Sequence, residues 1–377
     1  MTGRRLQNLN GVRPLRPLAA LSLLTWAWAV LVALADRRHR VDLRGAPPET
    51  EGPLVSAIVP ARNEEGRIGP ALRSLAAQSY GALEVIVVDD ESEDGTFAEA
   101  RAVVSERLRV LEGKPLPPGW VGKSWANHQG AEAARGEWLL LTDADILHAP
   151  DSLARALPLA RRLGRGGLTV LCRLDSETAS ERVIQPAAAV FIRSFVAPGP
   201  LVRSPRSNVA LAAGGYILVE RTLYDRIGGH AAIRSEIVDD QALARSVKAA
   251  GGLLVFVFGG DLVRVRMYHG LVELWRGWRK NSSAGVGSTG RAIGAGLQGL
   301  VVSLVPVLAL ARGPRRLGAA ALALQVVARA EVDPVAPSPR SYWLTLPLGG
   351  AFVSVVSLAS SLDRLRGGLV WRGRRYP

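Results

Sequence analysis

Cysteine and lysine are scarce in this chain of 377 residues, and each shortage narrows the possible functions. The single cysteine, Cys172, excludes an intrachain disulfide and a cysteine-based zinc site, and we expect it to pack as a small apolar residue in a strand. Only four of the 47 basic residues are lysines, so the net charge of +14 reflects a general bias toward arginine. We therefore do not interpret this charge as a functional surface and predict no nucleic-acid partner.

Apolar residues make up 48% of the sequence, and the excess over an ordinary soluble domain lies in three uncharged runs. The runs are Leu18–Ala35, Ala292–Ala311 and Ser341–Leu362. Each is long enough to cross a hydrocarbon core of about 30 Å. A shorter run, Leu317–Ala328, is compatible with a span, with half of a hairpin or with an interfacial helix. The sequence therefore predicts a membrane protein with one large polar domain between its first and second spans.

The first apolar run has some features of a secretory signal peptide, because arginines precede it and Ala33-Leu34-Ala35 resembles a cleavage site. However, it exceeds the usual apolar length and contains two tryptophans. We expect an uncleaved membrane anchor over residues 1–35 and a polar linker over 36–52. Four arginines precede the run and four follow it closely, so flanking charge does not set its orientation.

Residues 53–270 alternate between strand-like and helix-like segments, the pattern of a doubly wound α/β domain. Strands are predicted over 54–60, 84–90, 137–143, 167–172 and 216–220. Helices are predicted over 68–78, 94–105, 123–134, 151–163, 181–196 and 239–250.

Acidic and amide residues follow three of the predicted strands. They are Asn63, Glu64, Asp89, Asp90, Asp143 and Asp145. In open α/β sheets, ligands bind in the crevice at the carboxyl ends of the strands. Two carboxylates one residue apart suit a hard divalent cation, which can in turn hold a diphosphate. Each aspartate pair alone is compatible with a solvated turn, but the clusters together predict one acidic crevice.

Two further features could belong to the same crevice. Asp239 and Asp240 begin a predicted helix, where the helix dipole stabilises carboxylates, although simple N-capping is the alternative. Lys123 stands at a loop-to-helix junction, where its ammonium group could neutralise a diphosphate. An ordinary lysine at a helix start is the alternative.

Residues 271–281 predict an amphipathic helix before the second apolar run. One face carries Leu271, Leu274, Trp275 and Trp278, with Arg276, Arg279 and Lys280 nearby. Tryptophan and basic residues beside a span are typical of an interfacial helix, and an ordinary packed helix is the alternative. We expect this helix and a joint over 271–291, transmembrane helices over 292–362, and a basic tail over 363–377 at a lipid headgroup surface.

Four segments together resemble the family 2 glycosyltransferases of the GT-A fold, over roughly residues 53–280. They are VSAIVPARNEE (55–65), EVIVVDDESEDGT (84–96), TDADILH (142–148) and EIVDDQALARSVKAAG (236–251). Residues 115–126 and 267–281 are similar to bacterial enzymes that glycosylate carotenoid acids or are associated with hopanoids, and more distantly to ceramide glucosyltransferases. The Gln and final Trp of the processive Gln-x-x-Arg-Trp motif are absent from 276–280, which favours transfer of a single sugar.

The resemblance implies an α/β fold of the GT-A type, a doubly wound nucleotide-sugar-binding domain with transmembrane helices at both ends. It assigns Asp240 as general base and Asp145, helped by Asp143, as the ligand of Mg²⁺ or Mn²⁺. The cation and Lys123 would neutralise the departing diphosphate. The nucleoside is assigned to Asn63, Glu64, Asp89 and Asp90.

The acceptor side is assigned to Asp239, which replaces the family's common Glu, and to the interfacial helix with Trp275, Arg276, Trp278, Arg279 and Lys280. For His148 we favour a structural or acceptor-side role over metal binding. The predicted activity is inverting transfer of a hexose from a nucleotide diphosphate sugar to a membrane lipid that is carotenoid-, hopanoid- or sphingolipid-like.

Nucleotide sugars are cytosolic, so this activity implies a multi-pass protein of the cell (plasma or inner) membrane with a cytoplasmic catalytic domain. Two alternatives remain at this stage. One is a polyprenyl-phosphate sugar synthase, and the other is a non-catalytic membrane scaffold with a degenerate transferase domain.

Overall fold

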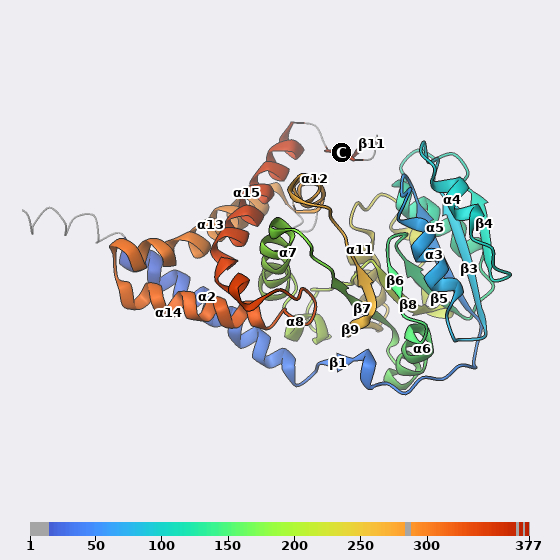
Figure 1. The fold of residues 1–377 in the computed structure, drawn as a ribbon, viewed down its shortest axis with the longest axis horizontal. Coiled ribbons are helices and arrows are strands. Elements are labelled where there is room, and N and C mark those ends of the chain that lie inside the picture. Colours follow the sequence, from blue (N-terminus) through green and yellow to red (C-terminus); the bar gives the residue numbers. More distant parts are fainter. Residues whose placement is uncertain (1–14, 283–287, 367–368, 372–373, 377) are drawn as a thin grey trace, which may run out of the picture. The chain divides into compact units, whose positions relative to one another are not determined.

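The computed structural model describes residues 15–282, 288–366, 369–371 and 374–376, and it divides into two compact units (Figure 1). The sheet unit comprises Arg40–Asp175 and Leu201–Met267. The helical unit comprises the described parts of Met1–His39, Ser176–Pro200 and Tyr268–Pro377.

The sheet unit is built on one mixed sheet with the strand order β1-β9-β7-β8-β5-β2-β3-β4, and β6 pairs with β9. The strands are β1 (Val41–Asp42), β2 (Val55–Ala61), β3 (Leu83–Asp89), β4 (Leu108–Glu112), β5 (Trp138–Thr142), β6 (Leu147–His148), β7 (Gly166–Leu174), β8 (Tyr216–Glu220) and β9 (Leu253–Val265). Strands β5, β2, β3 and β4 run parallel, and β8 is antiparallel to β5 and β7.

Helices cover both faces of this sheet. They are α3 (Ile68–Ala76), α4 (Thr96–Ala102), α5 (Gly122–Ala133), α6 (Ser152–Leu163), α9 (Arg221–Arg226), α10 (Gly229–Ala232) and α11 (Asp239–Ala249). Successive residues of β2 point to opposite faces: Ala57 packs in the core that includes residues of α3 and α6, and Ile58 in the core that includes residues of α5 and α11. Burial on both faces explains the continuous apolar runs of the central strands. The predicted α/β architecture is confirmed.

Several elements differ from the predictions. Strands β1, β4, β6 and β9 and the short helices α9 and α10 were not predicted, and α4 ends at Ala102 instead of continuing through 105. Glycines Gly259 and Gly260 interrupt the apolar pattern of β9, and its pairing with β7 shifts register on both sides of Cys172. Residues 41–45, within the segment interpreted as a linker, form β1 and a 3₁₀ turn, and β1 pairs with β9.

The helical unit contains three helices long and apolar enough to cross a membrane among the described residues, namely Leu15–Arg37, Thr289–Arg312 and Arg340–Leu365. They correspond to α2 (Leu15–Arg37), α13 (Thr289–Arg312), and the 3₁₀ segment Arg340–Thr345 with α15 (Leu346–Leu365). The unit also contains α7 (Ala179–Phe191), the π-helical turn Ile192–Val196, α12 (Leu271–Asn281) and α14 (Arg315–Ala330). The three predicted apolar runs are therefore helical and support association with a membrane.

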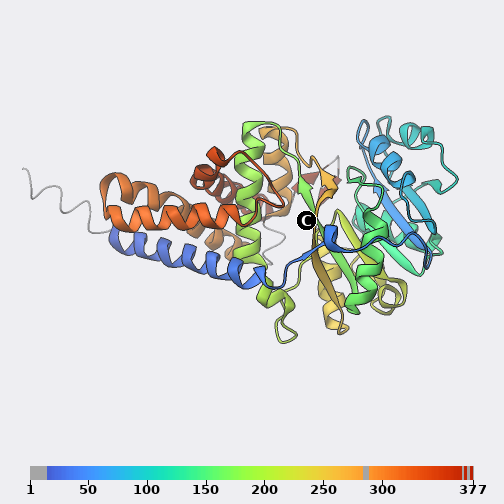
Figure 2. The same cartoon turned by 60° about the horizontal axis from the view of Figure 1, so that its bottom comes forward.

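Helices α13 and α14 form a hairpin, so the short run Leu317–Ala328 is half of a helical pair. A Cβ atom on Gly318 would lie 2.6 Å from the backbone nitrogen of Leu310, so glycine permits this close approach. Helix α2 packs along both members of the hairpin, as Figure 2 shows.

One backbone carbonyl joins these three helices. Pro306 has no N–H group, so the carbonyl of Val302 one turn earlier lacks its normal helical hydrogen bond. Ser22 Oγ and Trp26 Nε1 of α2 each donate to this carbonyl at 2.8 Å. Gln325 Nε2 of α14 donates to it at 3.2 Å. The proline thus creates a buried acceptor that holds α2, α13 and α14 together.

Helix α12 has the predicted bounds and packs against other helices of its unit. Leu274 is fully buried, and the Trp275 ring meets Phe352 edge-on at 5.8 Å. Arg279 forms an ion pair with Asp363 of α15. The inner face of α12 is thus an ordinary packed face. The interfacial role assigned to Trp275, Arg276, Trp278, Arg279 and Lys280 stays a prediction.

Parts of the predicted joint and tail lie outside the described residues. In the joint these are residues 283–287, and in the tail they include Arg372. The described tail backbone forms an antiparallel pair of β10 (Leu369–Trp371) and β11 (Arg374–Tyr376).

Candidate active site

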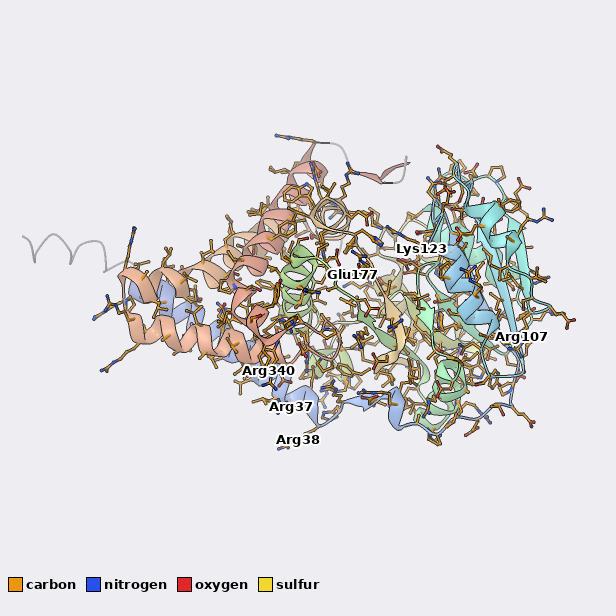
Figure 3. The ribbon with its side chains drawn as sticks, viewed as in Figure 1. Arg37, Arg38, Arg107, Lys123, Glu177 and Arg340 are labelled. Carbon is orange, nitrogen blue, oxygen red and sulfur yellow. The ribbon has the colours of Figure 1, made fainter. Side chains whose placement is uncertain are left out.

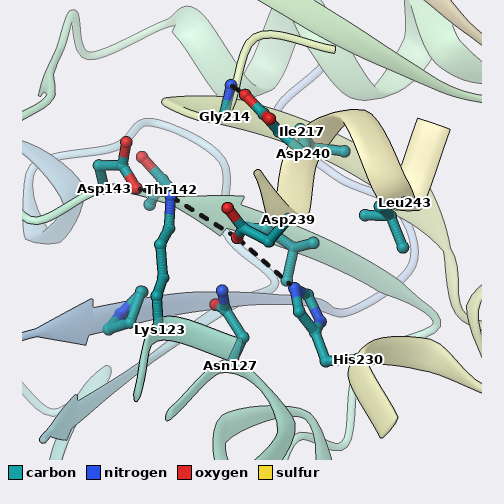
Figure 4. A pocket seen from close by; sticks show the side chains of 12 residues that line it. Lys123, Asn127, Thr142, Asp143, Gly214, Ile217, His230, Asp239, Asp240 and Leu243 are labelled. Atoms are coloured by element: carbon teal, nitrogen blue, oxygen red, sulfur yellow. Dashed lines mark hydrogen bonds and ion pairs between the residues drawn. The ribbon is translucent and has the colours of Figure 1, made fainter. Parts of the chain in front are cut away.

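A pocket lies at the point where the strand order of the sheet reverses. From β2 the chain proceeds to β3 and β4 on one side, and β5 pairs with the other side of β2. The carboxyl ends of strands at such a switch point are the usual ligand site of open α/β sheets. The pocket is lined by Pro60, Lys123, Asn127, Leu141, Thr142, Asp143, Gly214, Ile217, His230, Asp239, Asp240 and Leu243 (Figure 4).

Lys123 provides the positive charge of this pocket. It stands in the first turn of α5 and is labelled in Figure 3. Its Nζ lies 2.7 Å from Asp143 Oδ1 and 3.7 Å from Asp239 Oδ2 (Figure 4). Burial alone would lower the pKa of the Lys123 ammonium, but Asp143 and Asp239 outweigh it and raise that pKa above its usual value. Lys123 therefore stays charged while its side chain remains 37% exposed to an incoming group.

Asp240 lines the pocket from the start of α11. Its Oδ2 accepts the Gly214 N–H at 3.1 Å, and its Oδ1 accepts the Gln241 N–H at 2.7 Å. A Cβ atom on Gly214 would lie 3.0 Å from Oδ2, so glycine allows the loop to approach the carboxylate. Burial, together with the neighbouring charge of Asp239, raises the pKa of Asp240 to about 6, against the opposing effect of Lys123. This carboxylate can therefore exchange a proton near neutral pH.

His230 contacts both Tyr224 and Asp239 at the pocket. The Tyr224 hydroxyl lies 2.8 Å from His230 Nδ1, and His230 Nε2 lies 3.9 Å from Asp239 Oδ2. His230 is buried, and burial lowers its pKa to about 4, so it is a neutral imidazole at physiological pH. The sequence did not indicate a role for His230. It directly follows Gly228-Gly229, a pair that is typical of the end of a secondary-structure element.

The residues assigned to the nucleoside lie at the carboxyl ends of β2 and β3. Asp89 and Asp90 are buried, and Asp89 Oδ1 has no hydrogen-bond partner in the part of the chain that the structure describes. Asn63 adopts a positive φ of 53°, and its Oδ1 accepts the Glu93 N–H at 2.9 Å. The Glu64 N–H donates to the hydroxyl of the threonine that begins α4. These residues share the sheet edge with the pocket but do not line it.

Asp145 is half-buried in the turn between β5 and β6 and is not among the pocket-lining residues. Burial raises the pKa of the Cys172 thiol, and the negative charges of Asp143 and Asp145 raise it further. His148 is buried in the sheet, with Nε2 3.2 Å from Thr142 Oγ1, and burial lowers its pKa to about 3. Within the described ranges, no group of three or more His, Cys, Asp or Glu side chains could hold a metal ion.

The structure thus brings four predicted site residues into one pocket: Lys123, Asp143, Asp239 and Asp240. The two strand-end loops and Asp145 stand apart from its lining, and the predicted residues of α12 belong to the helical unit. Asn127 and His230 also line the pocket but were not predicted.

Comparison with known proteins agrees with this arrangement. Residues 56–239 match the family model described as Glycosyl transferase family 2. The 4,4'-diaponeurosporenoate glycosyltransferase of Staphylococcus aureus (strain MRSA252) is 31% identical over 277 residues, which cover 71% of this chain and 70% of that protein. The mannosyltransferase PcManGT of Pyrobaculum calidifontis, solved with GDP-Man and Mn²⁺, has a TM-score of 0.56 at 21% identity, covering 93% of this chain and 99% of that chain.

The likeness to the Pyrobaculum structure concerns the fold, which is that of the GT-A glycosyltransferases. Fold and family match therefore define a glycosyltransferase of the GT-A fold that carries membrane-type helices near both ends of its described residues. The chain belongs to glycosyltransferase family 2, as its motifs predicted.

Proposed function

We propose that the protein transfers a hexose from a nucleotide diphosphate sugar to a membrane lipid, with inversion at the anomeric carbon. The pocket carries this proposal, because it places the Lys123 ammonium and three carboxylates at the switch point of the sheet. Three apolar helices support an acceptor that resides in the membrane. The staphylococcal relative is named for transfer to diaponeurosporenoate, which supports an apolar acceptor of the carotenoid type.

On the donor side, the nucleoside would bind at the strand-end loops with Asn63, Glu64, Asp89 and Asp90. The buried, open oxygen Asp89 Oδ1 supports this role, because a buried acceptor is normally paired. Lys123 would exchange part of its contact with Asp143 for the diphosphate oxygens. Its raised pKa keeps the opposing charge in place throughout the reaction.

In this proposal, Asp143 and Asp145 would hold a divalent cation such as Mg²⁺ or Mn²⁺. Two carboxylates one residue apart supply hard oxygen ligands, and in such sites substrate phosphates and water complete the coordination. When bound, the cation would neutralise charge on the leaving diphosphate. In the PcManGT complex, Mn²⁺ accompanies GDP-Man.

On the acceptor side, Asp240 would act as general base. The acceptor oxygen bonds to the anomeric carbon while the bond from that carbon to the diphosphate breaks, and Asp240 takes the hydroxyl proton. With a pKa of about 6, Asp240 is mostly deprotonated at pH 7 and ready to accept it. For a carboxylate acceptor, no proton needs removal, and Asp240 would position the acceptor instead.

The proposed location follows from the donor. Because nucleotide sugars are cytosolic, the catalytic domain over 53–270 would face the cytoplasm of a multi-pass cell-membrane protein. The anchor over 1–35 and the helices over 292–362 would hold it at the bilayer, with the residues over 271–291 at the interface.

Membranes containing the full chain would test this function directly. They would be incubated with a panel of labelled UDP- and GDP-hexoses, and the extracted lipids would be identified. We expect label in one apolar lipid, and none with membranes containing the Asp240→Asn variant. Label only in an acid-labile polyprenyl phosphate would favour the alternative synthase. No label together with no nucleotide-sugar binding would contradict the proposal and favour a scaffold.

A further inference from the structure

Asn127 is a buried pocket residue without an evident structural task. It lies four residues after Lys123 on α5, so the two side chains occupy the same helix face. Asn127 is only 2% exposed, and Figure 4 shows its amide directed into the pocket near Lys123 and His230. Its Oδ1 atom has no hydrogen-bond partner within the described part of the chain.

The other polar side chains of the pocket already have protein partners. Lys123 pairs with Asp143 and Asp239, Asp240 accepts two backbone N–H groups, and His230 pairs with Tyr224. A buried amide oxygen that is left open costs free energy unless a ligand supplies the missing donor. Asn127 therefore differs from its neighbours in having an acceptor available for substrate.

We propose that Asn127 recognises a hydroxyl group on the hexose of the donor. This inference rests on the proposed function and specifies which part of the substrate the residue binds. A neutral amide offers both a donor and an acceptor, which matches a hydroxyl group, whereas a diphosphate calls for a cation. Lys123 provides that cation one helical turn away, about 5–6 Å between Cβ atoms, so diphosphate and hexose would occupy adjacent positions along α5.

The chain offers a matched control on the same helix. Gln129 is also a buried amide, but its Oε1 accepts the Lys114 N–H at 2.7 Å, and it does not line the pocket. Its replacement by alanine removes a structural hydrogen bond and leaves the pocket lining intact. Asn127→Ala removes the proposed substrate contact. Asn127→Leu has a side chain of similar size but neither the acceptor oxygen nor the amide donor, which keeps the test valid if the alanine variant folds poorly.

The test is equilibrium binding to the full-length protein in detergent, with Mn²⁺ present. The ligands are the nucleotide diphosphate alone, the intact nucleotide hexose, and analogues that lack one hexose hydroxyl each. We expect Asn127→Ala to weaken binding of the nucleotide hexose by about 5- to 150-fold and to leave binding of the nucleotide diphosphate unchanged. The analogue that lacks the hydroxyl group bound by Asn127 should have the same affinity for wild type and for Asn127→Ala. Gln129→Ala should bind all ligands as wild type does.

Other results would overturn the inference. Unchanged binding of the nucleotide hexose by both Asn127 variants would contradict it, as would an equal loss for the nucleotide diphosphate and the nucleotide hexose. In both cases the wild-type protein still binds donor, so the proposed function survives. If the wild-type protein binds no nucleotide sugar, the proposed function fails and the inference fails with it.

Discussion

In the helical unit, side chains from two helices converge on one backbone carbonyl, whereas in the sheet unit polar side chains line a pocket. The Val302 carbonyl receives three donors, and the fully buried Arg329 donates to the Ala336 carbonyl and to Ser338. In the pocket, by contrast, Lys123 is partly exposed and Asn127 has an open acceptor. Polar groups bonded to the backbone hold helices together, and those arranged around open space are available for chemistry.

This contrast predicts that substitutions in the two units have separable effects. Changes in the pocket should act chiefly on turnover or donor binding. Changes at the Val302 carbonyl should lower stability and leave donor binding intact.

The largest effect is expected for Asp240→Asn. The variant cannot accept the acceptor proton, so turnover should fall by about 10²–10⁴-fold, the usual contribution of a general base. Donor binding should stay within a few-fold of wild type, because the amide retains the shape of the side chain. Turnover measured with a labelled donor, beside donor affinity from calorimetry, checks both statements. Turnover equal to wild type would remove Asp240 from the mechanism.

Lys123→Met should have the next largest effect. It removes the charge that would face the diphosphate, so donor affinity should fall by about 10- to 150-fold, the range of a charged hydrogen bond. It also removes the cation that lowers the pKa of Asp240, so the acidic limb of the pH–rate profile should move to higher pH. Lys114→Met, in the loop before α5, is the control and should change neither quantity. Weaker donor binding without a shift of the acidic limb would show that Lys123 does not lower the pKa of Asp240.

The pH dependence of wild-type turnover on a hydroxyl acceptor should show a limb near pH 6. Asp240 works as a base only when deprotonated, so the rate should fall about tenfold per pH unit well below its pKa of about 6. His230, with a pKa of about 4, stays neutral across this range and adds no second limb above pH 5. Rates measured from pH 4.5 to 8.5 test this, and a flat profile between pH 5 and 7 would count against Asp240.

Protein stability should respond to pH at the same residue with a defined sign. The pKa of folded Asp240 lies above its ordinary value of 3.8, so the folded state binds the proton more tightly than the unfolded state. This stabilisation is complete below pH 3.8 and is lost as pH rises through about 6. Asp240→Asn does not titrate, so its melting temperature relative to that of wild type should be higher at pH 8 than at pH 4. Thermal unfolding at both pH values provides the comparison.

The smallest effect is expected in the helical unit. Trp26→Phe removes one hydrogen bond to the Val302 carbonyl and should cost about 0.5–1.5 kcal/mol of stability. The affinity for the nucleotide sugar should not change. Trp28→Phe on the same helix alters a side chain that is 50% exposed and should cost less. Unfolding in detergent measures the difference. Weaker binding of the nucleotide sugar by the Trp26 variant, but not by the Trp28 variant, would contradict the prediction that substitutions in the two units have separable effects.

Much of the sheet and four of the twelve residues that line the pocket could be predicted from the sequence. Strands β2, β3 and β5 are covered on both faces and so appear as continuous apolar runs, each followed by acids. Helix α11 begins with Asp239 and Asp240 and is followed by two glycines. Strand β9 could not be predicted in the same way, because its glycines and its shifted register with β7 depend on tertiary pairing.

The rest of the pocket depends on contacts that sequence spacing does not reveal. Asn127 is an ordinary polar residue within a predicted helix, and only its burial with an open oxygen distinguishes it. One signal was available, since its spacing of four from Lys123 places both on one helix face. His230 belongs to the pocket because it contacts Tyr224 and Asp239. Only the folded chain shows these contacts.

The most direct measurement of the central claim is calorimetric binding, with Mn²⁺, of the nucleotide sugar that labels lipid in membranes. The full-length wild-type protein would be compared with Asp143→Asn, which alters the pocket, and with Asp225→Asn, which alters an exposed ion pair on α9. We predict that Asp143→Asn weakens donor binding at least about tenfold, since it removes a carboxylate assigned to the cation, and that Asp225→Asn binds as wild type does. Equal affinity of the Asp143 variant and the wild type would show that the donor binds elsewhere.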